Sequence, residues 1–163
     1  MRWTVVDSPI GELLLGADAG ALCRLNFGRG RPPRAGHDPV RDDPVLRETA
    51  RQLERYFAGR LIRFTVPLTL RGSDFERRVW EALRQIPYGE TRSYGDIAKA
   101  VGDPSAARAV GIANNHNPVA LIVPCHRVIG ADGKLVGYGG GLPRKRHLLS
   151  LEARVTIERD FAS

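Results

Sequence analysis

Cysteine is scarce in this sequence: among 163 residues only Cys23 and Cys125 occur, far apart along the chain. Two distant cysteines do not form the disulfide framework that staples small secreted domains. The Cys-x-x-Cys and His-x-x-x-His spacings that are typical of zinc sites are also missing. We therefore expect no structural disulfide, no bound metal and a reducing compartment, the cytoplasm.

Long apolar runs are missing as well. The longest span a few residues, whereas a membrane-spanning helix needs about 20. The first residues, "MRWTVVDSPIG", lack the apolar stretch of a signal peptide. We expect no membrane partner. With 42% hydrophobic and 26% charged residues, the composition is that of a globular protein with a core of its own.

Lysine is the third scarcity, since Lys99, Lys134 and Lys145 are the only ones and arginine supplies most of the basic charge. The formal net charge is nonetheless +7, which favours a polyanionic partner such as nucleic acid. Arginine is also the better bidentate ligand for phosphate. Charge alone leaves the identity of the partner open.

The first 71 residues predict a small α/β domain. In residues 1–27, "MRWTVV", "ELLLGA" and "ALCRLNF" alternate with turn-forming "DSPIG" and "DAG", which predicts a small antiparallel sheet. Apolar spacing predicts a helix over 45–58 and a strand over 61–70. The Gly-, Pro- and Arg-rich segment 28–44 predicts an exposed loop. The basic residues of this loop, interpreted as solvated rather than phosphate-bound, are Arg29, Arg31 and Arg34.

Residues 72–155 predict a second domain that is mostly helical. A capping box, Ser73 with Glu76, begins a helix with an apolar stripe. The segment "VALIV" predicts a buried strand, and "PRKRHLLSLEA" predicts a final helix. We expect the remaining residues, 156–163, to form a tail that adds a strand or stays loosely attached.

Two short helices joined by "GDPS" form a helix-turn-helix candidate within this second domain. Ser93 and Asp96 form a capping box at the start of the first helix. Gly102 ends that helix, and Asp103 is expected to cap the next one, "SAARAVGIANN", with Pro104 in its first position. Together with the positive charge, this motif favours a nucleic acid as the partner.

The sequence "PCHRV" places a cysteine beside a histidine. A thiolate rather than a thiol is the nucleophile, and a neighbouring base increases its fraction. A turn after the proline brings His126 close to Cys125, and a carboxylate that orients the histidine completes a cysteine-histidine-acid relay. On spacing alone, Glu152 and Asp132 are both candidates for that carboxylate. The plainer interpretation is a small buried core cysteine.

Four stretches carry a resemblance to a known family: "IPYGETRSYGDIA", "AARAVG", "NNHNPVALIVPCHRVIG" and "GYGGGLPRKRHLLSLE". Together they resemble the alkylguanine-DNA alkyltransferases, which take an alkyl group from DNA onto their own cysteine. The likeness is strong over residues 73–152. Over residues 1–70 it is looser and rests on "DSPIG", "LLL" and "YFAG", in keeping with that family's N-terminal α/β domain.

The resemblance implies a role for each matching residue. Cys125 is similar to the acceptor nucleophile, His126 to its base through a bridging water, and Glu152 to the carboxylate that holds the histidine. Asn117 resembles a hinge asparagine, and Arg108 the arginine finger that fills the gap left by an extruded base. The positions similar to DNA-contacting residues are Ser93, Tyr94, Ala107, Arg108 and Gly111. The positions similar to the base pocket are Tyr94, Val128, Tyr138, Gly139 and Gly140.

The implied function is single-use repair of double-stranded DNA. An alkyl group on O6 of guanine moves irreversibly to Cys125 after the base is flipped out, with the motif in the minor groove. Tyr94 resembles the tyrosine that pushes on the phosphate and contacts the flipped base. O4-alkylthymine is left open as a second substrate, and we expect no cofactor and a monomer. Gly139 stands where many members carry serine, so the hydroxyl that such members place near O6 is missing here.

Three alternatives differ in class. An alkyltransferase-like damage sensor binds lesions without repair, but such relatives replace the cysteine, commonly with tryptophan, and Cys125 is present here. A cysteine hydrolase needs water to release its intermediate, whereas a thioether is not hydrolysed. A transcription factor that relies on the helix-turn-helix is compatible with repair.

Overall fold

The structure, a computed structural model, describes residues 1–27, 43–135 and 137–162. The two compact units into which the chain divides are Met1–Arg71 with Pro118–Ala120, and Gly72–Asn117 with Leu121–Ser163. In the described part of the chain, no helix combines the length and the apolar composition needed to cross a bilayer.

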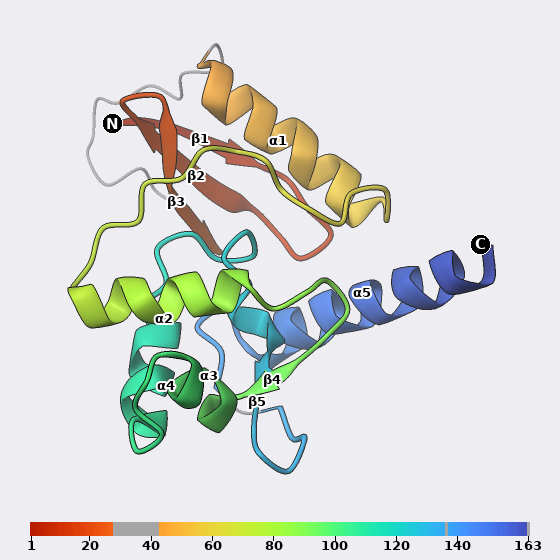
Figure 1. Cartoon of the computed structure of the whole chain (residues 1–163). Coiled ribbons are helices and arrows are strands. Elements are labelled where there is room, and N and C mark those ends of the chain that lie inside the picture. The colour runs from red at the N-terminus through yellow and green to blue at the C-terminus, as the bar shows by residue number, and fades with distance from the viewer. Residues whose placement is uncertain (28–42, 136, 163) are drawn as a thin grey trace. The chain divides into compact units, whose positions relative to one another are not determined.

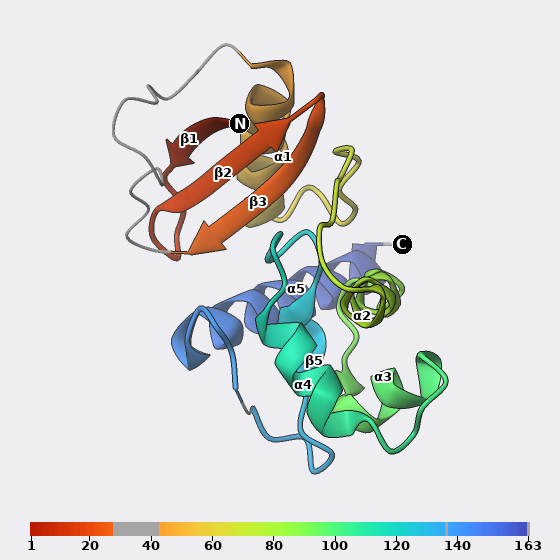
Figure 2. The ribbon, with the colours of Figure 1, turned by 90° about the vertical axis from the view of Figure 1, so that its left-hand side faces the viewer.

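The first unit is a three-stranded antiparallel sheet with one helix across a face (Figure 1, Figure 2). Its elements are β1 (Arg2–Val6), β2 (Leu13–Asp18), β3 (Ala21–Phe27) and α1 (Pro44–Phe57). Ala19 and Gly20 join β2 to β3 with positive φ angles of 50° and 80°, as hairpin turns of type I′ require. The wholly buried leucines of the sheet are Leu13, Leu15, Leu22 and Leu25. The predicted sheet and helix are confirmed.

Helix α1 begins one residue earlier than expected. The Asp43 side chain accepts hydrogen bonds from the backbone N–H groups of Val45 (2.9 Å) and Leu46 (3.1 Å), and Pro44 occupies the first turn. The rest of the predicted loop over 28–44, including its three arginines, lies outside the described residues.

The strand expected over 61–70 is wrong. Only an isolated bridge forms there, between Leu22 and Leu68. The carbonyl of Pro67 accepts from Leu22 N–H (2.8 Å), but proline has no N–H with which to extend a ladder. The apolar side chains of this segment are buried only in part: Val66 is buried, whereas Ile62 is 40% exposed.

The strand expected from "VALIV" is also wrong. Val119 forms a bridge to Leu25 of β3, whose backbone exchanges hydrogen bonds with Pro118 (2.9 Å) and Ala120 (3.1 Å). The extended conformation then stops at Leu121, whose φ is 71°. A left-handed residue cannot continue a strand, so the apolar run is divided between the two units.

The second unit is mostly helical, as predicted. Its elements are α2 (Asp74–Arg84), β4 (Arg92–Ser93), α3 (Tyr94–Ala100), α4 (Ala107–Asn115), η1 (Cys125–Arg127), β5 (Val128–Ile129) and α5 (Leu142–Ala162). Both predicted capping boxes form, at the starts of α2 and α3. Trp80 of α2 is buried and donates its Nε1–H to the carbonyl of Ala113 in α4 at 2.9 Å. This bond ties α2 to the helix-turn-helix formed by α3 and α4.

Two predictions about helix ends need correction. Asp103 does not cap α4; its Oδ1 accepts from the N–H (3.1 Å) and hydroxyl (2.6 Å) of Ser105, and α4 begins at Ala107 without a side-chain cap. Residues 156–163 are not a separate tail, because α5 continues to Ala162. The segment contains no glycine or proline to end the helix, and Val155 is buried.

Candidate active site

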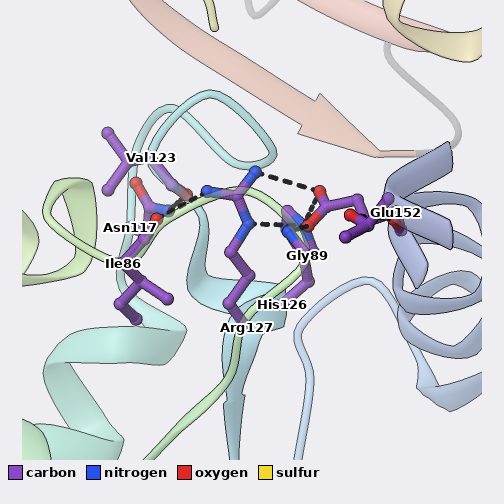
Figure 3. A network of polar contacts seen from close by, with 8 residues as sticks. Ile86, Gly89, Asn117, Val123, His126, Arg127 and Glu152 are labelled. Carbon is purple, nitrogen blue, oxygen red and sulfur yellow. Dashed lines mark hydrogen bonds and ion pairs between the residues drawn. The ribbon is translucent and has the colours of Figure 1, made fainter. Parts of the chain in front are cut away.

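Cys125 begins the short 3-10 helix η1, which follows an irregular turn rather than a strand. A local backbone hydrogen bond stabilises this turn: Cys125 N–H donates to the carbonyl of Val123 at 2.8 Å. The side chain of Asn117 donates its Nδ2–H to the same carbonyl, also at 2.8 Å (Figure 3). Asn117 follows the end of α4, so this bond connects the helix-turn-helix to the turn that precedes Cys125.

The Cys125 thiol is buried, with 5% of the residue exposed. Burial raises the pKa of the thiol, and the hydrogen bonds from the Asn117 and Tyr138 side chains offset this only in part. At neutral pH the free protein therefore holds a thiol rather than a thiolate. A base must remove the proton before the sulfur acts as a nucleophile.

His126, which follows Cys125, is hydrogen-bonded to a carboxylate. Its Nε2 lies 2.7 Å from Oε2 of Glu152 on α5, and both side chains are buried (Figure 3). Of the two carboxylates that spacing allowed, Glu152 makes this contact, whereas Asp132 is exposed and its Oδ1 accepts from the backbone N–H of Lys134. His126 and Glu152 are thus paired, and Cys125 directly precedes His126 in η1.

The ionisation of Glu152 is set by this network. Burial acts to raise the pKa of Glu152, but hydrogen bonds and charge from His126 and Arg127 hold it well below its usual range. Arg127 donates from Nε to Oε1 (2.8 Å) and from Nη2 to Oε2 (3.1 Å), and the backbone N–H of Gly89 donates to Oε1 at 3.3 Å. Glu152 is therefore a fully paired buried carboxylate.

The charge on Glu152 fixes the tautomer of His126. Burial lowers the pKa of His126, and Glu152 raises it only in part, so the imidazole is neutral at pH 7. A neutral ring facing an ionised carboxylate carries its hydrogen on Nε2. Nδ1 then has a free lone pair, and among the described residues it has no hydrogen-bond partner. His126 is able to accept one proton there.

Three residues of the site were not singled out from the sequence. Arg127 also donates from Nη1 to the carbonyl of Ile86 at 2.8 Å. Lys145 is wholly buried in α5 and donates to the carbonyl of Val128. Asn114, buried in α4, donates to the carbonyl of Cys125 at 3.4 Å. Basic and amide side chains are mostly exposed in proteins, so a single sequence offers little signal for their burial.

The predicted pocket residues lie on segments next to the cysteine. β5, with Val128, pairs in parallel with β4, and Tyr94 follows β4 directly. Burial raises the pKa of Tyr94, and the proximity of Cys125 adds to the rise. Tyr138 is half-buried and is hydrogen-bonded to Cys125. Gly139 is exposed, and the carbonyl of the buried Gly140 accepts from Arg144 at 2.9 Å.

The predicted DNA-contacting residues lie on α3 and α4, except Ser93, which ends β4 and caps α3. Arg108 is exposed near the start of α4, one residue after the half-buried Ala107. Gly111 faces the ring of Tyr94: an added Cβ would lie 3.7 Å from Tyr94 Cε1. Ser93 caps α3 through its Oγ, which accepts from Asp96 N–H at 3.0 Å. Arg108 is therefore available to a partner, whereas Gly111 contributes to the packing of Tyr94.

Comparison with known proteins covers both units. Residues 1–70 match the ribonuclease-like domain of 6-O-methylguanine DNA methyltransferase, and residues 74–154 match its DNA binding domain. A methylated-DNA–protein-cysteine methyltransferase from Methanosarcina acetivorans is 53% identical over 153 residues, which cover 93% of this chain and 98% of the relative. One from Mycobacterium tuberculosis is 54% identical over 154 residues, or 93% and 92% of the two chains.

Solved structures agree with this result. The chain is similar to the crystal structure of Mycobacterium tuberculosis OGT in complex with DNA, with a TM-score of 0.86, 54% identity and coverage of 95% and 94% of the two chains. It is also similar to an O6-methylguanine DNA methyltransferase from Methanococcus jannaschii, with a TM-score of 0.71, 28% identity and coverage of 92% and 93%. The chain belongs to the 6-O-methylguanine DNA methyltransferase family.

Proposed function

We propose that this protein is a methylated-DNA–protein-cysteine methyltransferase that repairs DNA by moving an alkyl group from O6 of guanine to Cys125. The observation that carries the proposal is the arrangement at η1: a buried thiol adjoins a neutral histidine whose Nε2–H is held by an ionised, buried Glu152. The names of relatives that are more than 50% identical over most of the chain support the same activity.

The proposed reaction is a single displacement. The thiol proton passes through a water molecule to Nδ1 of His126, and Glu152 stabilises the imidazolium that results. A sulfur lone pair then forms a bond to the alkyl carbon while the bond from that carbon to O6 breaks. The electron pair of the broken bond stays on the guanine, which takes up one proton and is restored. The thioether on Cys125 has no route back to a thiol, so each chain acts once.

Access to the buried thiol requires the base to leave the duplex. Flipping a base costs a few kcal/mol, and an inserted side chain offsets part of that cost. In the proposal the exposed Arg108 fills the gap in the minor groove, and Tyr94 contacts the flipped base and presses on its phosphate. Val128, Tyr138 and the two glycines after Tyr138 line the pocket. All of these residues belong to one chain, so a monomer without cofactor suffices.

Intact-mass measurement tests the proposal. The protein is incubated with an excess of a duplex that contains one O6-methylguanine, and with a duplex that contains O4-methylthymine. We expect a gain of one methyl group per chain with the first duplex, located on the peptide that contains Cys125, and none in Cys125→Ala. Binding without any gain in mass would identify a damage sensor, and multiple turnover or methylation of Cys23 would contradict the proposal. The second duplex decides whether thymine lesions are substrates.

A further inference from the structure

Asn114 is an amide buried beside the nucleophile, and its oxygen is unsatisfied. The residue is 2% exposed and is the last but one residue of α4. Its Nδ2 donates to the carbonyl of Cys125 at 3.4 Å. Its Oδ1 is buried and has no hydrogen-bond partner among the described residues. An unsatisfied buried acceptor costs about 1–3 kcal/mol, so its presence requires an explanation.

The orientation of this amide is fixed by its neighbour. If oxygen and nitrogen of Asn114 exchanged places, Oδ1 would face the carbonyl oxygen of Cys125, and two acceptors would oppose each other. The amide hydrogen must therefore point to the carbonyl of Cys125, and Oδ1 must point elsewhere. The unsatisfied atom is an acceptor that needs a donor.

A second unsatisfied acceptor lies on η1, next to Cys125. Nδ1 of His126 is buried without a partner in the described chain, and its tautomer makes it an acceptor as well. His126 follows Cys125 in η1, and Asn114 is bonded to the Cys125 carbonyl. Both acceptors therefore belong to residues attached to Cys125, one through the hydrogen bond to its carbonyl and one through the peptide bond. A buried water molecule commonly satisfies two to four such polar groups.

We propose that Asn114 is a positioning residue for proton transfer from Cys125, because its Oδ1 orients the water that links the thiol to His126. That water donates one hydrogen to Nδ1 of His126 and the other to Oδ1 of Asn114. Both of its hydrogens are then engaged, so its remaining lone pair faces the thiol and accepts the S–H hydrogen. The proton of Cys125 moves to the water, and a water proton moves to His126. This inference rests on the proposed function and specifies how its base is aligned.

Two substitutions at one position separate this role from a merely structural one. Asn114→Leu keeps the volume but removes both hydrogen-bonding groups. Asn114→Asp keeps an acceptor for the water but no longer donates to the Cys125 carbonyl. If Asn114 orients the water, the aspartate variant reacts faster than the leucine variant at neutral pH. If Asn114 only holds the carbonyl, the aspartate variant is as slow or slower. Asn115→Leu, an exposed neighbour on α4, is the matched control.

The measurement is single-turnover methyl transfer at saturating duplex from pH 6.5 to 9.5, with melting temperatures to exclude unfolding. We expect Asn114→Leu to be about 10-fold slower than wild type at pH 7, and the defect to shrink as pH rises because the thiol ionises without help. A parallel titration with iodoacetamide follows Cys125 in the absence of DNA. If wild type accepts no methyl group, the proposed function fails, and the iodoacetamide profile still tests Asn114. Identical pH profiles for wild type and Asn114→Leu would overturn the inference while leaving the transfer activity intact.

Discussion

Nε2 of His126 lies 2.7 Å from Oε2 of Glu152, and neither side chain is accessible to solvent. Arg127 donates from Nε to the other oxygen of the same carboxylate, Oε1, at 2.8 Å. Glu152 therefore has two tasks: it neutralises a buried guanidinium, and it orients the imidazole that accepts the thiol proton. The two tasks have different experimental signatures, one in the rate of transfer and one in the pH dependence of stability.

The first prediction concerns the rate. Glu152→Gln keeps the shape of the side chain but removes the charge that stabilises a protonated His126. We expect slower methyl transfer at pH 7, by about 10- to 100-fold, the effect that is typical of carboxylates that orient a metal-ligating histidine. Part of the rate should return toward pH 9, where the thiol needs less help to ionise. Single-turnover rate constants at saturating duplex check this.

Asp132→Asn is the matched control for that experiment. Asp132 was the second carboxylate compatible with the sequence spacing, but it is exposed. Its substitution should leave the rate and its pH profile unchanged. An equal response of the two variants would contradict the assignment of Glu152 as the partner of His126.

The second prediction concerns stability in acid. The pKa of Glu152 in the folded chain lies below its ordinary value of 4.5, so the ionised group stabilises the fold above pH 4.5. That stabilisation is lost as the pH falls below 4.5 toward the folded-state pKa. At pH 7, Glu152→Gln leaves Arg127 buried without its counter-charge and should reduce the free energy of unfolding by about 3 kcal/mol. Urea denaturation from pH 7 to pH 3 should show that wild type and Glu152→Gln become more alike in their free energies of unfolding. A difference in free energy that stays constant over this range would contradict the prediction.

The sequence predicts those parts of the fold that depend on near neighbours. The sheet of the first unit follows from turn residues such as Gly20, and the starts of α2 and α3 follow from Ser73 and Ser93. In each case the stabilising contact joins residues within three positions of each other. Short-range contacts of this kind are visible in a single sequence.

The two segments in which the predicted strands do not form depend on pairing with distant parts of the chain. The apolar alternation around Val66 and the run at Val119 are both typical of strands, but a strand exists only if another backbone offers a complete ladder. Pro67 interrupts one pairing and the left-handed Leu121 interrupts the other. The length of α5 was missed for a related reason, because its last turns lack an evident cap or an obvious apolar stripe.

The site was predicted in part. Cys125 and His126 are adjacent in sequence, so their association needs no knowledge of the fold. Glu152 was one of two candidates until the structure placed α5 beside η1. Arg127 and Asn114 are buried polar groups whose partners lie far away in the chain, and residue type alone predicts that they are exposed.

The third prediction concerns Gly111 on α4. An added Cβ would meet the Tyr94 ring at 3.7 Å, which is an ordinary van der Waals distance. Gly111→Ala should therefore gain helix stability of about 0.5–1 kcal/mol and raise the melting temperature by about 2 °C. Gly102→Ala is the contrasting variant: no atom lies within 4 Å of an added Cβ there, but its φ of 87° is strained for any other residue, so the melting temperature should fall. A lower melting temperature for Gly111→Ala would mean that Tyr94 cannot accommodate the methyl group.

The last prediction tests Arg108 as the residue that replaces the flipped base. Arg108→Ala keeps Cys125 and its base intact, so the chemistry itself should be unaffected. If the guanidinium fills the gap in the duplex, its loss makes the flipped state less favourable by about 1.4 kcal/mol and slows transfer on duplex DNA about 10-fold at saturation. A short single strand with the same lesion needs no gap to be filled and should react at a rate close to that of wild type. Arg108→Lys keeps the charge without the planar group, so it should retain the salt dependence of binding while transferring slowly. An equal loss of rate on duplex and single strand would assign Arg108 to phosphate binding instead, and a wild-type rate on duplex would remove it from the flipping step.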